Sequence, residues 1–341
     1  MSMRRGWVLL TVVGLLAAGP VVWAAIRQVR QQSEAMELVR RAATAHRRVS
    51  YSGELSWRRG RWERPVYVAH DAESGRTLYG WSVLWSYVAS RPSTKAPDPV
   101  AWCRSIDALE RNYRAEERAT SRYLDRPVRL IRLEPRYEAR PVVELTVDVE
   151  TDLPLKVTTY HQDGSLGNVV AFRKIKFGPQ AVKTRVPRHG RSRSIPLDRI
   201  LDAVSFEPLS PAYLPQGFLL HECRVSGVSV RKLTFVYTDG ISRLELTQGV
   251  IPTPAQMETE YVLRYGRWRA RRRMRRYHAE CKRALVQSDG SESGKITAKR
   301  RRHGRYQTYQ LIVGDLDIEL RSPANLPAEE SARVLRSLRV R

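Results

Sequence analysis

The hydrophobic pattern begins with an apolar run, residues 7–26, which reads WVLLTVVGLLAAGPVVWAAI and follows two arginines. A helix of about 20 apolar residues spans the ~30 Å hydrocarbon core of a bilayer, so the run predicts a membrane-targeting segment. Residues 22–24 fit a signal peptidase site, whereas Arg27 and Arg30 directly after the run favour an uncleaved anchor. Both alternatives stay open. In either case the positive-inside rule predicts that the rest of the chain is exported.

A second pattern, rich in helix formers, predicts a short helix over residues 33–49 with Val29, Met36, Arg40 and Ala43 on one side. Period-two alternation follows and predicts antiparallel strands at 51–57 and 66–70, then an aromatic stretch at 78–87. Asp98-Pro99 resembles a helix start, and Trp102, Ile106, Leu109 and Tyr113 recur at helical spacing. We therefore expect one helix from Asp98 to Tyr113, lying across the sheet.

Alternation resumes further along and completes an antiparallel meander, with strands expected at 128–133, 143–149, 155–161 and 169–177. Residues 179–194 are rich in proline and basic side chains without an apolar period, which predicts a linker. A smaller unit follows, in which Asp239-Gly240 joins strands 232–238 and 241–248 and Gly314-Asp315 joins 306–313 and 316–321. The pattern ends with a helix over 327–338. The predicted organisation is thus a targeting segment at 1–26, a first domain at 27–195 and a second at 196–341.

Composition fits a folded protein, since 42% of the residues are hydrophobic and 28% are charged. These values exclude wholesale disorder and a multi-span membrane protein. The charge balance is unusual: 60 Lys and Arg against 35 Asp and Glu give a net charge of +25. Such an excess predicts an anionic partner, either nucleic acid, a lipid headgroup surface or an acidic protein, although the arginines also fit codon bias in a GC-rich genome.

The cysteines give little information. Cys103, Cys223 and Cys281 are widely spaced, without a CxxC motif or a Cys/His ligand pattern. The spacing is compatible with a bridge between Cys223 and Cys281, and equally with three unpaired thiols.

No catalytic motif is present: the chain has no GxSxG elbow, HExxH, P-loop, GxGxxG or EF-hand spacing. The seven histidines are scattered, and Glu329-Glu330 fall in the first turn of the last helix, where negative charge favours the helix dipole. We therefore expect a protein without enzymatic activity, cofactor or metal.

The densest basic segment has eight arginines between positions 264 and 276, with Tyr265, Trp268 and Tyr277 interleaved. Its aromatics suit stacking on bases, but nucleic acid is an improbable ligand for an exported protein. Anionic lipid or an acidic protein segment is the better candidate, and a solvated loop without a partner is the alternative. The candidate binding residues are Arg267, Arg269, Arg271, Arg272, Arg273, Arg275 and Arg276.

Aromatic residues are concentrated on the first predicted strands. A curved sheet crossed by a helix leaves a concave apolar face, which is a natural cavity for an acyl chain or an apolar peptide. Ordinary core packing is the alternative. The candidate cavity residues are Trp57, Tyr67, Trp81, Trp85, Leu145 and Val147.

Several short motifs resemble those of a known family. Residues 147–156, VDVETDLPLK, followed by Asp163-Gly164, resemble a strand-turn-strand of LolA-like domains. Tyr51-Ser52-Gly53 and residues 130–135 are similar to the N-terminal domain of the periplasmic MucB/RseB proteins. Residues 211–218, PAYLPQGF, and 236–242, VYTDGIS, resemble segments of the C-terminal domain of that family.

The resemblance implies an α+β protein: a LolA-like half-open antiparallel β-barrel covered by helices, then a smaller α+β domain. It also implies a non-catalytic envelope-stress regulator in the periplasm, which binds the periplasmic domain of a membrane-spanning anti-sigma factor and senses a lipidic or lipoprotein signal. A lipid or lipoprotein carrier that uses the same cavity is the alternative.

Overall fold

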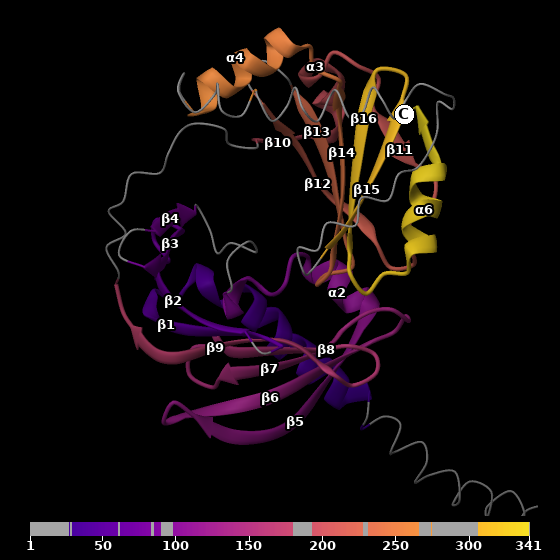
Figure 1. Ribbon diagram of the computed structural model, residues 1–341. Helices are drawn as coiled ribbons and strands as arrows, with labels where there is room; N and C mark the ends of the chain where they lie inside the picture. The colour runs from indigo at the N-terminus through magenta and orange to yellow at the C-terminus, as the bar shows by residue number, and fades with distance from the viewer. Residues whose placement is uncertain are drawn as a thin grey trace, which may run out of the picture. The chain divides into compact units, whose positions relative to one another are not determined.

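The structure, a computed structural model, describes residues 27, 29–60, 62–82, 85–89, 98–179, 193–227, 231–265, 274 and 306–340. The chain forms two compact units (Figure 1). Unit 1 comprises Met1–Trp102, Tyr113–Arg136 and Pro141–Thr184; unit 2 comprises Cys103–Asn112, Tyr137–Arg140 and Arg185–Arg341. The chain therefore passes from unit 1 into unit 2 and back twice before the final crossing. The boundaries inferred from sequence, 26/27 and 195/196, stay a prediction.

Unit 1 is built on a nine-stranded antiparallel sheet in the order β4-β3-β2-β1-β9-β8-β7-β6-β5. Because β4 and β5 are both edges, the sheet is open and does not close into a barrel. This confirms the half-open antiparallel architecture. The strands are β1 (Tyr51–Arg59), β2 (Trp62–Asp71), β3 (Arg76–Ser82), β4 (Trp85–Ala89), β5 (Tyr113–Tyr123), β6 (Arg126–Pro135), β7 (Val142–Asp148), β8 (Pro154–Tyr160) and β9 (Leu166–Phe177).

The fully buried side chains of β1 lie on one face of the sheet, as the alternation in its sequence predicts. On β1, Tyr51 and Leu55 are fully buried, and they lie opposite His70 and Val66 of β2. Gly60 adopts a φ of 55° in the turn between β1 and β2, a conformation that a residue with a Cβ avoids. The meander from β6 to β9 also forms as the alternation predicts.

The first helix lies at residues 29–44 and continues into the 3-10 turn η1 (Ala45–Arg47). Its buried positions differ from the predicted ones: Ala35, Leu38, Val39 and Ala42 are buried, whereas Val29 is 67% exposed. The predicted side of the helix was wrong: it included Arg40, which is exposed. The buried set instead follows the i, i+3, i+4, i+7 spacing of an apolar stripe.

The single helix expected from Asp98 to Tyr113 is also wrong. Asp98 does cap a helix, accepting a 2.9 Å hydrogen bond from the Val100 N–H, but that helix is the 3-10 turn η2 (Pro99–Ala101). A separate helix, α2 (Ile106–Asn112), follows, and Tyr113 opens β5. Apolar spacing alone cannot show that the chain changes direction twice within this stretch.

Unit 2 contains a six-stranded antiparallel sheet in the order β10-β12-β13-β14-β16-β15 and a small β11-β17 pair. Both predicted hairpins, β13-β14 and β15-β16, are present. The first has a longer loop than expected, because β14 begins at Arg243 rather than Ile241. The strands are β10 (Arg193–Ile195), β11 (Leu209–Pro211), β12 (Leu219–Ser226), β13 (Lys232–Thr238), β14 (Arg243–Val250), β15 (Tyr306–Val313), β16 (Leu316–Pro323) and β17 (Leu338–Val340).

Helices complete unit 2. The last one, α6 (Ala328–Arg336), agrees with the predicted helix and buries Ser331, Val334 and Leu335 against the core. Not predicted were η3 (Leu197–Arg199), α3 (Ile200–Ala203) and α4 (Pro254–Tyr265). The core of this unit centres on side chains of β13, β14 and β16 that are wholly buried, such as Phe235, Leu246 and Ile318.

Some predicted features lie outside the described residues. They include the apolar run at 7–26, most of the predicted linker, and Cys281. The last two linker positions, Arg193 and Ser194, belong to β10. Within the ranges that the structure does describe, no helix is both long and apolar enough to cross a membrane.

Candidate functional site

The predicted cavity residues are only partly brought together. Trp57, Val170, Val157 and Leu145 lie side by side across β1, β9, β8 and β7, as the strand registers show. Val147 lies two residues further along β7, on the same face. Leu145 and Val147 are no more than 1% exposed and belong to the core, whereas Trp57 is half-buried and donates its Nε1–H to Asn168 Oδ1 at 2.5 Å.

The remaining cavity residues do not join this row. Tyr67 is 50% exposed and lies opposite Glu54, so it belongs to the other face of the sheet from Trp57. Trp81 and Trp85 lie on β3 and β4, but their side chains are outside what the structure describes. The cavity therefore stays a prediction.

Unit 1 contains a buried polar cluster that sequence analysis missed. Asp98 Oδ2 accepts hydrogen bonds from the Tyr79 hydroxyl at 2.6 Å and the Tyr51 hydroxyl at 3.4 Å. The ring of His70 lies 5.1 Å from that of Tyr51, and its two nitrogens contact Thr77 Oγ1 at 2.8 Å and the His46 carbonyl oxygen at 2.7 Å. Burial raises the pKa of Asp98 and, together with Asp98, raises that of Tyr51 well above its usual value.

The recognised VDVETDLPLK motif forms a tight turn between β7 and β8. Asp148 is fully buried and accepts 2.9 Å and 2.6 Å hydrogen bonds from the Thr151 N–H and hydroxyl. Arg126 donates two hydrogen bonds to the same carboxylate, from Nε to Oδ1 at 2.7 Å and from a terminal nitrogen to Oδ2 at 3.1 Å. Asp152, with a φ of 57°, contacts Arg41 of the first helix at 3.2 Å. The side chains of the motif therefore stabilise the turn and connect it to the first helix.

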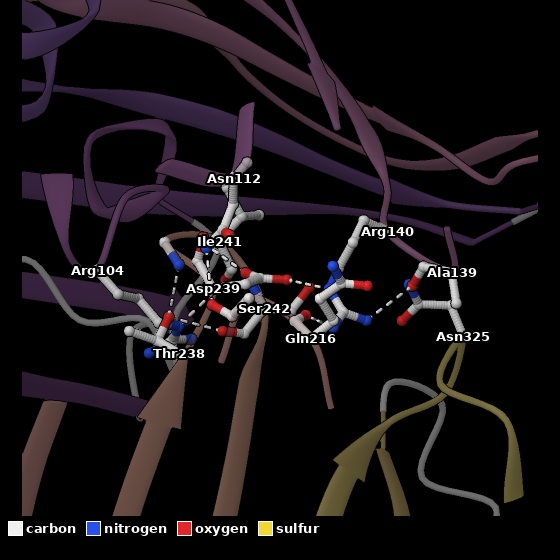
Figure 2. A network of polar contacts seen from close by, with 12 residues as sticks. Arg104, Asn112, Ala139, Arg140, Gln216, Thr238, Asp239, Ile241, Ser242 and Asn325 are labelled. Atoms are coloured by element: carbon white, nitrogen blue, oxygen red, sulfur yellow. Dashed lines mark hydrogen bonds and ion pairs between the residues drawn. The ribbon is translucent and has the colours of Figure 1, made fainter. Parts of the chain in front are cut away.

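Unit 2 contains a network of polar contacts centred on Asp239 (Figure 2). Asp239 is wholly buried, and its Oδ1 accepts hydrogen bonds from the N–H groups of Ile241 at 3.0 Å and Ser242 at 2.6 Å. These bonds shape the loop between β13 and β14. Asp239 Oδ2 lies 2.8 Å from Arg140 Nε. Neither of those two atoms has a well-aligned hydrogen bond within the described part of the chain, so their attraction is Coulombic.

Two segments from the first half of the chain complete this network. Arg140, at 4% exposure, also donates to the Gln216 carbonyl at 2.8 Å, and its guanidinium lies 4.5 Å from the Phe218 ring centroid. Asn112 donates through Nδ2 to the Gly217 carbonyl at 2.7 Å and the Asp239 carbonyl at 2.9 Å. The network thus joins the recognised PAYLPQGF and VYTDGIS motifs.

Gly240 has no room for a side chain. Its φ is 106°, and a Cβ built on it would lie 2.6 Å from the backbone of Leu109 in α2. The Arg104 N–H also donates to the Gly240 carbonyl at 2.8 Å. Sequence analysis found Asp239-Gly240 as a hairpin signal. It gave no sign that the segment before α2 docks there, because no local pattern marks a contact between residues so far apart in sequence.

The remaining candidate groups are metal ligands, the Cys103 thiol and the arginine-rich segment. No cluster of His, Cys, Asp or Glu among the described residues could hold a metal ion. Burial raises the pKa of the Cys103 thiol to about 12. The seven candidate arginines between 267 and 276 lie outside the described residues, so their role stays a prediction.

Comparisons with known proteins agree with the resemblance in the motifs. Residues 79–189 match the model of the MucB/RseB N-terminal domain. The crystal structure of MucB is similar with a TM-score of 0.58 and 17% identity, over 91% of this chain and 98% of that one. Comparison with curated protein sequences gave no match.

Two further structures contain MucB with a partner. MucB in complex with MucA(peri) gives a TM-score of 0.54 and 18% identity, over 90% of this chain and 98% of that one. The MucA/MucB complex of Pseudomonas aeruginosa gives 0.55 and 19%, over 90% and 99%. The resemblance is therefore confirmed: this chain contains a region that matches the MucB/RseB N-terminal domain, and it has the α+β fold of MucB.

Proposed function

We propose that this protein is an envelope regulator that binds the periplasmic segment of a membrane-spanning anti-sigma factor. The observation that carries the proposal is the agreement in fold with MucB over 91% of the chain, in a family whose solved structures include complexes with MucA. The networks around Asp148 and Asp239 support it. Their charged groups hold turns and segments in place, which suits a rigid binding scaffold.

The charge of the chain favours an acidic partner. A net charge of +25 speeds association with an acidic segment and makes the affinity depend on salt. The proposal places the protein on the periplasmic side of the inner membrane, with residues 7–26 as anchor or signal segment. The run of candidate arginines would then act near a surface rich in anionic lipid headgroups.

A lipidic signal is the finer part of the proposal. An acyl chain of a mislocalised lipoprotein would lie against the apolar face of the unit 1 sheet. Its support is Trp57, which is half-buried in the same row as the fully buried Leu145 and directs its Nε1–H to Asn168. Binding of the lipid would change the affinity for the anti-sigma factor.

Purification from crosslinked cells tests the proposal. The tagged full-length chain is purified after crosslinking in its own host, and the captured proteins and lipids are identified. We expect a single-span anti-sigma factor, captured less when Arg271, Arg272, Arg273, Arg275 and Arg276 are replaced by Ser. The matched control replaces by Ser five exposed arginines elsewhere in the described chain, namely Arg47, Arg111, Arg114, Arg199 and Arg336. Capture of acyl lipids without any anti-sigma factor would refute the regulator and favour the carrier.

A further inference from the structure

Tryptophan and arginine alternate at the end of the hairpin that β1 and β2 form. Trp57 of β1 lies directly opposite Arg64 of β2, and Arg59 lies opposite Trp62 beside the turn. The two strands pair without a register shift, and residues directly opposite each other in an antiparallel pair share a face of the sheet. The two indoles and the two guanidinium groups therefore belong to one face, and we call these four residues the hairpin-end surface.

The hairpin-end surface continues the buried face of the sheet into solvent. Leu55 and Val66, the next pair along the hairpin on the same face, are no more than 1% exposed. Trp57 is half-buried, and Trp62 is 72% exposed, the highest value among the large apolar side chains that the structure describes. Tryptophan is on average a well-buried residue, so an indole this exposed suits contact with another apolar phase.

The positive charge of this surface is not compensated locally. Within the described chain, neither Arg59 nor Arg64 forms an ion pair or a side-chain hydrogen bond. The two glutamates of the hairpin, Glu54 and Glu63, lie on the opposite face, where Glu63 forms an ion pair with Arg173 of β9. The hairpin-end surface therefore combines exposed indole with cations that are available to an external anion.

We propose that the hairpin-end surface docks on an anionic lipid bilayer, with Trp62 at the boundary between headgroups and acyl chains and Arg59 and Arg64 at the level of the phosphates. An indole has an apolar body and a polar N–H, so it is stable at that boundary, and an arginine can bury its stem while its guanidinium contacts phosphate. An acidic protein segment would neutralise the arginines but would not transfer Trp62 out of water as an acyl layer does. The contact goes beyond the proposed function, and it involves neither the apolar run at 7–26 nor the candidate arginines at 267–276.

Quenching of Trp62 fluorescence tests this on the full-length chain. The chain is mixed with vesicles that carry bromine on their acyl chains, which quenches only an indole in contact with those chains. The vesicles contain phosphatidylcholine alone or equal parts of phosphatidylcholine and phosphatidylglycerol. The emission of Trp62 is the difference between the native protein and Trp62→Phe, so that the other tryptophans cancel. We expect quenching of Trp62 by the anionic vesicles but not by the neutral ones, and a loss of quenching as salt rises, because salt screens the arginines.

Charge variants of the hairpin give the second arm. Arg59→Ser combined with Arg64→Ser should raise the lipid concentration for half-maximal quenching at least about tenfold, because two cations leave the anionic surface. Replacing both by Lys should keep quenching, since the charge remains. The matched control, Arg58→Ser with Lys174→Ser, removes two exposed cations from the opposite face of the same sheet and should leave quenching unchanged.

Three results would overturn the proposal. Equal quenching by neutral and anionic vesicles would show that charge has no part in the contact. Native quenching in the double Ser variant would show that Arg59 and Arg64 do not face the lipid. A change in Trp62 emission with a glutamate-rich peptide but not with anionic vesicles would assign the surface to an acidic protein. The assay contains no anti-sigma factor, so its result does not bear on the proposed function.

Discussion

The buried pair of Arg140 and Asp239 allows a quantitative test of how unit 2 is held together. In Arg140→Met the side chain still covers Phe218, but the charge is gone. Asp239 then keeps its hydrogen bonds to the N–H groups of Ile241 and Ser242, whereas its Oδ2, 2.8 Å from Arg140 Nε in the native protein, loses its counter-charge. Asp239 is wholly buried, so solvent cannot replace the arginine. Removing one partner of such a pair costs about 3–5 kcal/mol.

The double variant separates the charge from other losses. Arg140→Met with Asp239→Asn removes both charges, and the Asn oxygen can still accept the two loop N–H groups. Since a buried pair replaced as a whole is often close to neutral, the double variant should regain at least about 2 kcal/mol relative to Arg140→Met alone. A merely additive loss would contradict the electrostatic reasoning.

Hydrogen exchange of the full-length chain gives the readout for each unit separately. Amides of β13 and β14 should lose protection by about 2 to 3.5 powers of ten in Arg140→Met, since each 1.4 kcal/mol corresponds to a factor of ten. Amides of β6 and β7 in unit 1 are the internal reference. Arg199→Met, an exposed arginine of unit 2, is the matched control and should stay within about 0.5 kcal/mol of the native protein. A cost below about 1 kcal/mol for Arg140→Met would refute the reasoning.

Four further measurements follow from the described contacts. Burial favours the neutral carboxyl of Asp148, but hydrogen bonds from Arg126 and Thr151 outweigh it and hold its pKa below the usual value. The ionised Asp148 carboxylate therefore stabilises the folded state above the unfolded pKa of ~3.9, and this stabilisation is lost as pH falls through the folded pKa. The difference in free energy of unfolding between the native protein and Asp148→Asn should therefore narrow below about pH 4 in acid denaturation. Burial raises the pKa of Asp98, and the sign of the pH dependence is opposite. Native stability declines as pH rises above the unfolded pKa of ~3.9 towards the raised folded pKa, so Asp98→Asn should gain stability relative to the native protein as pH rises above about 4 in urea titrations. Gly240→Ala should cost more than about 2 kcal/mol, against about 1 kcal/mol for Gly314→Ala, where φ is also positive but the space is open; equal melting temperatures would contradict the clash with Leu109. With a pKa of about 12, the Cys103 thiol should react with a disulfide reagent at pH 8 at least about a hundredfold more slowly than a model thiol, measured as the difference between native protein and Cys103→Ser.

Local patterns predicted the strands that have one buried and one solvated face. β1 and β7 alternate in sequence, although Thr146 and Asp148 on the second face of β7 are buried as well, and Gly314-Asp315 marked a hairpin that forms as expected. β5 was missed because most of its side chains are exposed, so an edge strand rich in charge has no hydrophobic period. The turn after Asp98 was missed for another reason. The chain leaves unit 1 at residue 103 and re-enters it at 113, and only contacts between distant segments determine that path.

The polar networks show the same limit at the level of single side chains. Sequence analysis identified Asp239-Gly240 and the Asp148 turn as motifs, but neither Arg140 nor Arg126 attracted attention. An arginine that neutralises a buried aspartate looks the same in a sequence as the many solvated arginines of this chain. In a protein with a net charge of +25, many arginines have no acidic partner, so the sequence does not distinguish the few that neutralise a buried carboxylate.

The family motifs therefore have a structural meaning that separates fold from partner choice. The VDVETDLPLK, PAYLPQGF and VYTDGIS segments, which carry the resemblance to MucB/RseB proteins, all form turns held by Arg126, Arg140 and Asn112. Such residues determine whether the two units form, and their polar groups are engaged in holding those turns rather than in selecting a ligand. Specificity then has to come from surfaces outside the motifs. In the described part of the chain, the edge strands of the two sheets, such as the charged β5 and the uncharged β15, lie outside these motifs and can change without any change in them.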